Sequence, residues 1–106
     1  MADATQQREQ TLREHFHSQT AKIPWRELQT HYARGAVVHV AGERNLVEVA
    51  VQLGMDNTDQ FQTWIDSGDA AAVGDEQALA WFENDAQMWA VVAAPWVLVQ
   101  AVTSRS

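Results

Sequence analysis

The chain has 106 residues, 46% of them hydrophobic, with 7 basic and 14 acidic side chains and no cysteine. This length predicts a single domain over residues 1–106, with frayed ends at residues 1–5 and 103–106. The lack of cysteine excludes a disulfide scaffold, thiolate metal sites and a cysteine nucleophile, and it is consistent with a cytoplasmic location. The net charge of −7 argues against nucleic acid as a partner, because affinity for its backbone comes mainly from Lys and Arg.

The charge is unevenly distributed along the chain. Residues 45–104 contain nine acidic side chains and neither Lys nor Arg, whereas all but one of the basic side chains lie in residues 1–44. If the two parts form separate surfaces, the molecule is electrically lopsided and has a surface that suits a basic partner. The apolar run at residues 88–102 is about 15 residues long and therefore too short to span a bilayer, so no membrane partner is expected.

The first third of the chain predicts two helices. Residues 5–22 repeat apolar side chains at helical spacing among many polar ones, which indicates an amphipathic helix. A second helix is expected to begin at Pro24, because proline lacks an N–H and the first helical position has no partner for one. Gly35 is expected to end this helix in a left-handed cap. Its buried face is expected to contain Trp25, Leu28 and Tyr32.

Short strands and helices are expected to alternate in the middle of the chain. The β-branched run at residues 36–41 predicts a strand. Asn45 is expected to cap a helix that ends at Gly54, and Asp56 or Asn57 to cap the next one. The buried faces of these two helices are expected to contain Leu46, Val49, Ala50 and Leu53 in the first, and Phe61, Trp64 and Ile65 in the second.

A further strand and helix are expected after residue 69. Residues 70–73 fit a short strand. Asp75 and Glu76 are expected to begin a helix that continues to about Asn84, because carboxylates are favourable at the positive end of the helix dipole. Its buried side is expected to contain Ala78, Leu79, Trp81 and Phe82.

The end of the chain gives the strongest strand pattern. Residues 89–93 and 96–102 are apolar on both faces, so we expect strands that helices cover on both sides. A tight two-residue hairpin at Ala94 and Pro95 is not expected, because the favoured turns need positive φ and proline fixes φ near −65°. A wider turn or one bent strand is expected instead. The predicted fold class is α+β, a small sheet of three or four strands covered by four or five helices.

Three side chains are candidates for a chemical site. Glu27 and His31 are four residues apart in a predicted helix and could act as an acid–base or metal-ligand pair. An exposed helical ion pair explains them equally well, and metal sites usually need three or more ligands. His39 lies within a valine-rich strand, where its pKa is easily perturbed, but a catalytic role needs a partner that the sequence does not identify.

Recognisable enzyme and cofactor motifs are absent from the sequence. His15 and His17 would lie about 200° apart on a helix, a poor arrangement for chelation. The acidic residues between 56 and 69 do not have EF-hand spacing, and no phosphate loop, nucleophile elbow or zinc-protease pattern is present. We therefore predict no catalytic residue, no metal site and no cofactor.

Tryptophan and one glutamine complete the candidates. Five tryptophans are many for this length; most are expected in the core, while an excess could line a groove or interface, with Trp25 and Trp96 as candidates. Gln100 lies in an apolar strand and must be hydrogen-bonded if it is buried. We favour a structural role for it, in which it satisfies loop or helix-end backbone, over one in orienting a ligand.

Three segments carry a family resemblance. They are Ala-Lys-Ile-Pro-Trp-Arg-Glu-Leu at residues 21–28, Leu-Val-Glu-Val-Ala at 46–50 and Ala-Pro-Trp-Val-Leu-Val-Gln at 94–100. From about residue 20 to 101 the chain resembles a family of short bacterial proteins known only as a domain of unknown function. The resemblance implies a stand-alone cytoplasmic bacterial protein and supplies no activity, cofactor or catalytic residue. The family usually has serine in place of Pro24, where it would form a capping box with Glu27, so Glu27 here need not be merely a capping residue.

Two functions from different classes are compatible with these observations. The first, which we favour, is a non-catalytic protein-interaction or regulatory module. It would bind an unidentified protein partner with a basic surface, or form a homodimer through an apolar surface around the terminal strands. The second is a small-molecule-binding protein or enzyme whose site combines Glu27, His31 and His39 with a tryptophan-lined pocket. The second requires these three side chains to converge.

Overall fold

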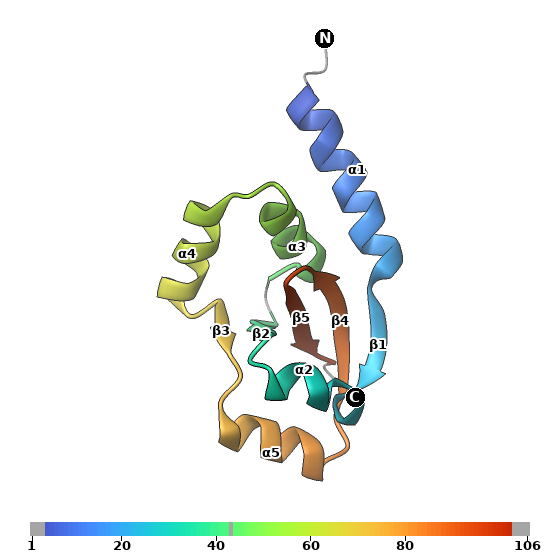
Figure 1. The fold of residues 1–106 in the computed structure, drawn as a ribbon, viewed down its shortest axis with the longest axis vertical. Coiled ribbons are helices and arrows are strands. Elements are labelled where there is room, and N and C mark those ends of the chain that lie inside the picture. Colours follow the sequence, from blue (N-terminus) through green and yellow to red (C-terminus); the bar gives the residue numbers. More distant parts are fainter. Residues whose placement is uncertain (1–3, 43, 103–106) are drawn as a thin grey trace.

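A five-stranded mixed sheet, with helices on both of its faces, forms the centre of the structure (Figure 1). The computed structural model describes residues 4–42 and 44–102. The spatial order of the strands is β1-β4-β5-β2-β3, and only β2 and β5 are parallel neighbours. The strands are β1 (Ala21–Pro24), β2 (Val37–Val40), β3 (Ala70–Ala72), β4 (Gln87–Ala93) and β5 (Trp96–Ala101). The α+β class is confirmed, but the sheet has five strands rather than three or four.

Five α-helices and one 3₁₀ helix occur in the described residues. They are α1 (Ala4–Gln19), η1 (Trp25–Leu28), α2 (Gln29–Ala33), α3 (Leu46–Gly54), α4 (Thr58–Ser67) and α5 (Asp75–Glu83). No helix among them combines the length and the apolar character that crossing a membrane requires. Of the chain ends predicted to fray, residues 1–3 and 103–106 lie outside the described part, and Ala4 and Thr5 are the first residues of α1.

The predicted first helix is shorter than expected, because the chain after residue 19 turns into β1. Ile23 pairs with Met88 of β4 instead of continuing the apolar stripe of α1. Pro24 is the physical reason, since a proline disfavours helical φ and ψ in the residue before it. Leu12 and Phe16, the other apolar members of that stripe, pack on the core as predicted.

The second predicted helix begins one residue later than expected and starts as a 3₁₀ turn. Pro24 has extended dihedrals, φ −65° and ψ 140°, so it is the last residue of β1 and the N-cap position of η1, not the first helical residue. Trp25 and Leu28 are buried as predicted, and Tyr32 packs against the same core. Gly35 has φ +71°, which confirms the left-handed conformation predicted for it.

The capping predictions for α3 and α4 are confirmed. Asn45 Oδ1 accepts a hydrogen bond from the backbone N–H of Glu48, and Asn57 Oδ1 accepts one from Gln60. Gly54 is the last residue of α3, where a methyl group would lie 3.2 Å from carbon atoms of Leu12 and Phe16. Glycine here therefore allows α1 and α3 to pack closely.

The turn between β4 and β5 contradicts the sequence prediction. Ala93 pairs with Trp96, so Ala94 and Pro95 form the tight two-residue connection that was not expected. The Ala94–Pro95 peptide bond is cis, as in the turn class that has proline at its third position and does not depend on positive φ. The prediction considered only the turns of trans peptides.

Two hydrophobic clusters lie on opposite faces of the sheet, as the apolar terminal strands predicted. On one face α1, α3 and α4 cover residues such as Val38, Val91 and Leu98. On the other, η1, α2 and α5 cover residues such as Val97 and Val99. Leu98 and Val99 are both fully buried although their side chains point to opposite faces, which places β5 at the centre of both clusters.

Three side chains expected in the core are exposed instead. Ile65 of α4 is 41% exposed, and Leu79 and Phe82 of α5 are 57% and 42% exposed. Trp64, Ala78 and Trp81 supply the buried faces of these two helices. A helix nine or ten residues long presents one narrow stripe to a sheet, so the apolar residues beside that stripe remain at the surface.

Candidate functional site

The structure does not gather the predicted chemical residues into one site. Glu27 lies on η1 and is exposed, whereas His31 lies on α2, so the two do not belong to one regular α-helix. His31 Nδ1 is 3.4 Å from Arg34 Nη2. None of the four cavities described below is lined by Glu27, His31 or His39. Within the described residues, no group of three His, Asp or Glu side chains could hold a metal ion.

His39 lies on β2, on the face covered by α5. Its ring contacts the edge of Trp81, with ring centroids 5.1 Å apart. Burial lowers the pKa of His39. The neutral imidazole is therefore the folded form at neutral pH, packed in a core contact and without a described catalytic partner.

We predict that His39 makes stability depend on pH between about 7 and 5. Because its pKa is lower in the folded state, the unfolded chain binds the proton first, and stability falls as pH drops below the unfolded value of about 6.5. His39→Gln should flatten this part of the curve of unfolding free energy against pH, measured with urea. His17→Gln, which changes an exposed histidine, should leave the slope intact, and an unchanged slope in His39→Gln would refute the prediction.

The contacts of Trp25 and Gln100 are those of residues that stabilise the fold. Trp25 is fully buried and makes edge contacts with the rings of Tyr32 and Trp81. Gln100 Nε2 donates hydrogen bonds to the backbone oxygens of Ala41, at 2.8 Å, and Arg44, at 2.6 Å. These bonds tie β5 to the loop between β2 and α3, which is the backbone-satisfying role favoured for Gln100.

Removing the Gln100 amide should destabilise the protein measurably. Gln100→Met keeps the length of the side chain but leaves both carbonyl oxygens without this donor, and we expect a loss of about 1–3 kcal/mol in the free energy of unfolding. Gln77→Met, on the exposed side of α5, is the matched control and should change stability by about 0.5 kcal/mol or less. Equal effects of the two changes would remove this role from Gln100.

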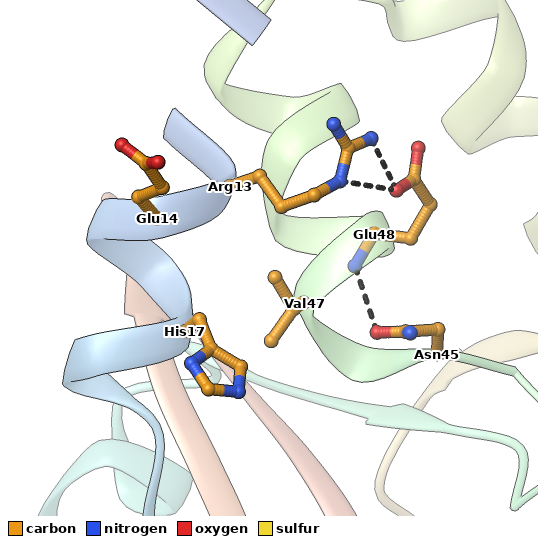
Figure 2. A pocket seen from close by; sticks show the side chains of 6 residues that line it. All are labelled: Arg13, Glu14, His17, Asn45, Val47 and Glu48. Atoms are coloured by element: carbon orange, nitrogen blue, oxygen red, sulfur yellow. Dashed lines mark hydrogen bonds and ion pairs between the residues drawn. The ribbon is translucent and has the colours of Figure 1, made fainter. Parts of the chain in front are cut away.

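A polar pocket of about 240 Å³ lies between α1 and α3 (Figure 2). Arg13 reaches across it and donates to Glu48 Oε2 through both Nε, at 3.3 Å, and Nη2, at 2.6 Å. His17 points into the pocket toward Val47, and Glu14 points away (Figure 2). Gln52 Nε2 donates to the second Glu48 oxygen at 3.2 Å, and these hydrogen bonds, chiefly that from Arg13, lower the pKa of Glu48. The charged groups at its centre therefore hold α1 against α3.

The outer edge of β3 is a different kind of surface. β3 lies at one end of the sheet order, and Figure 1 shows no helix or strand outside it. The backbone N–H of Ala41 donates to the backbone oxygen of Asp69. These two residues lie opposite each other when the β2–β3 register is continued. Hydrogen-bonded pairs alternate along an antiparallel ladder, so Ala71 faces β2, whereas the backbone groups of Ala70 and Ala72 point outward. Ala70 is only 1% exposed, so the accessible outward groups are those of Ala72.

Two cavities lie beside this edge, one on each face of the sheet. The first, on the α4 side, has a volume of about 340 Å³ and an apolar lining that includes Phe61, Ile65 and Trp96. The second, on the α2 and α5 side, has a volume of about 300 Å³, and its lining includes Tyr32 and Asp75. Gly35, Val37 and Ala72 line both. We call the outer edge of β3 together with these two cavities the edge groove.

The acidic residue that lines the second cavity is Asp75, the first residue of α5. Tyr32 Oη donates a hydrogen bond to Asp75 Oδ1, and this bond raises the pKa of Tyr32. Glu76 follows in the exposed first turn of the helix. The groove thus offers backbone hydrogen-bonding groups, an apolar hollow on one side and carboxylates on the other.

Comparison with known proteins identifies the family. Residues 11–101 match the family described as Protein of unknown function (DUF2288). The chain belongs to this family. The resemblance predicted from three short segments is therefore confirmed. No curated protein matches the chain significantly.

A solved structure with the same fold comes from Pseudomonas aeruginosa. The chain is 38% identical to the protein in the NMR solution structure of PA1075, with a TM-score of 0.78. The similarity covers 91% of this chain and 89% of that chain. The edge groove lies within the segment that matches the DUF2288 family, residues 11–101.

One residue of the edge groove was predicted from the sequence. Trp96 was a candidate interaction residue, and it lines the apolar cavity. Residues 70–73 were read as a strand, but nothing in three alanines shows that this strand lies at an edge. The short length of the strand was the available signal. Ile65, which was expected in the core, is exposed beside the groove, and only the orientation of α4 shows this.

Proposed function

We propose that this protein is a non-catalytic interaction module that binds an extended segment of a partner protein by strand addition at β3. One observation carries the proposal: the outward backbone groups of the exposed Ala72 lie between two cavities on opposite faces of the sheet. A cytoplasmic location belongs to the same proposal and is supported by the lack of cysteine.

Strand addition uses the two parts of the edge groove differently. The main chain of the added segment would exchange hydrogen bonds with Ala72, which supplies affinity without regard to sequence. Its side chains would alternate between the two faces, so successive residues would meet the apolar cavity and the cavity that contains Asp75. This combination gives selectivity for an alternating pattern.

Other features of β3 support an edge that is open to a partner. Proteins commonly protect edge strands with short length, charged side chains, proline, bulges or a covering element. β3 has its short length and the burial of Ala70, whereas Ala71 and Ala72 are exposed alanines that carry no charge. Small side chains also allow another backbone to approach closely.

A second copy of the chain suits this surface less well than a different protein. Self-pairing of β3 would bring together the acidic residues that flank it in both copies, and juxtaposed like charges oppose association. The homodimer expected around the terminal strands meets another difficulty, since β4 and β5 occupy the middle of the sheet and helices cover them. Trp89 and Val92 are the large apolar side chains that they expose.

The test is a proline substitution that blocks only the outward edge. Ala72→Pro removes an N–H that points away from β2, so the protein should fold, whereas Ala72→Ser keeps that N–H and is the matched control. Random peptides displayed on phage should be enriched by the original protein and by Ala72→Ser but not by Ala72→Pro. Bound peptide should also slow amide hydrogen exchange at Ala72.

Two results would contradict strand addition. The first is a set of enriched peptides that bind Ala72→Pro as tightly as they bind the original protein. The second is a library that yields no peptide with micromolar affinity, while circular dichroism shows that all three proteins are folded.

A further inference from the structure

We infer that the segment bound at the edge groove is basic at its centre and apolar on both sides of that centre; this inference rests on the proposed function. Its basis is a third hollow, of about 310 Å³, between α2 and α5. This hollow shares Tyr32 and Asp75 with the edge groove and continues along α5 to Leu79 and Phe82. A segment that follows the three hollows passes apolar, acidic and again apolar surface.

The two apolar parts of this track are exposed in the free protein. Ile65, beside the first hollow, is 41% exposed, and Leu79 and Phe82, beside the third, are 57% and 42% exposed. Leu79 is the most exposed of the three, so it would remove the most apolar surface from water when a partner covers it. Exposed apolar residues that line connected hollows are typical of interaction sites rather than of a random surface.

The ion pairs of the molecule leave part of its negative charge near this track without a partner. Three arginines from the first part of the chain pair with Glu48, Asp69 and Asp85 of the second part. The basic part and the acidic part of the chain therefore meet at these contacts and do not form two fully separate charged surfaces. Six carboxylates of the second part have no ion pair with a described basic residue: Asp56, Asp59, Asp66, Asp75, Glu76 and Glu83.

One of these carboxylates, Asp75, lines both the second and the third hollow, and Glu76 follows it in the exposed first turn of α5. The nearby basic residues do not neutralise them. Arg26 stacks over Phe82, 4.7 Å from the ring centroid, and pairs with Asp85 at the other end of α5. Arg34 precedes Gly35 and lies beside His31. A Lys or Arg of the partner is therefore expected at the Asp75 end of the track, and apolar residues on either side of it.

Two synthetic peptides test this inference. Both are roughly ten residues long, with apolar β-branched and aromatic residues toward their ends, and they differ only in one central residue, Lys or Glu, because neighbouring side chains of a strand point to opposite faces. Fluorescence anisotropy should show that the Lys peptide binds at least about tenfold more tightly at about 50 mM salt, and that this ratio shrinks at about 500 mM.

Variants of the protein locate the effect. Asp75→Asn with Glu76→Gln should weaken the Lys peptide about tenfold and remove the preference over the Glu peptide. Glu14→Gln with Asp56→Asn changes the net charge equally at positions that line neither the edge groove nor the third hollow, and it should keep the preference. Leu79→Ser with Phe82→Ser should weaken both peptides by about tenfold or more.

The outcomes separate this inference from the proposed function. Equal affinity for the two peptides, unaffected by salt, would overturn the inference; if Ala72→Pro then abolished binding of both, strand addition would stand. Binding of the Lys peptide to Ala72→Pro with unchanged affinity would overturn strand addition. Failure of both peptides to bind the folded protein below about 1 mM would also overturn the inference.

Discussion

Replacing Trp25 with alanine should lower the free energy of unfolding by about 3–5 kcal/mol. Trp25 is fully buried, and its ring packs edge-on against Tyr32 and Trp81, so alanine would open a cavity between η1 and α5. This loss is a large part of the total free energy of unfolding, which is about 5–15 kcal/mol for most proteins. Urea unfolding followed by circular dichroism measures the loss.

Two further substitutions make the Trp25 result specific. Its indole Nε1 is buried without a hydrogen-bond partner, so Trp25→Phe removes an unpaired donor as well as part of the ring, and it should cost less than half as much as alanine. Trp89, which is 39% exposed beside Lys22, is the control, and Trp89→Ala should cost about 1 kcal/mol or less. A Trp25→Ala loss as small as that of Trp89→Ala would contradict the packing described.

Leu98→Ala should cost about 2–5 kcal/mol. Leu98 is fully buried in β5, where it belongs to the cluster under α1, α3 and α4. The strands on both sides of β5 hold the backbone in place, so the surrounding structure has little freedom to close the cavity. The midpoint and slope of urea unfolding give the change in stability.

Leu79→Ala is the matched control for Leu98, because the same atoms are removed from a side chain that is 57% exposed. We expect a change of about 0.5 kcal/mol or less. This comparison also tests the orientation of α5, for which the sequence pattern predicted a buried Leu79. Similar losses for the two leucines would show that α5 presents a different face to the sheet.

Local signals in the sequence predicted the local parts of the fold. Asn45 and Asn57 form side-chain caps and Gly35 adopts positive φ, because these conformations depend on a few neighbouring residues. β1 was missed because its pairing with β4 joins residues more than sixty positions apart. The same limit applies to the faces of α4 and α5, since a short amphipathic helix has several apolar residues and only tertiary packing decides which are buried.

The candidate site depended even more on long-range structure. His31 and His39 were considered together because they are close in sequence, but α2 and β2 give them separate surroundings. The edge groove brings Tyr32 and Asp75 together from distant segments, and its hydrogen-bonding groups belong to alanine backbone. Side-chain motifs cannot reveal a surface whose main recognition groups are common to every residue.

The position of β5 in the sheet has a consequence for synthesis on the ribosome. β5 is the last strand of the described residues, yet it lies between β4 and β2. Until it emerges, the growing chain can form only two separate ladders, β1 with β4 and β2 with β3. The two hydrophobic clusters would then lack the strand that both share. The nascent protein therefore cannot complete its core in order from the N-terminus, and folding is completed after translation of residue 101.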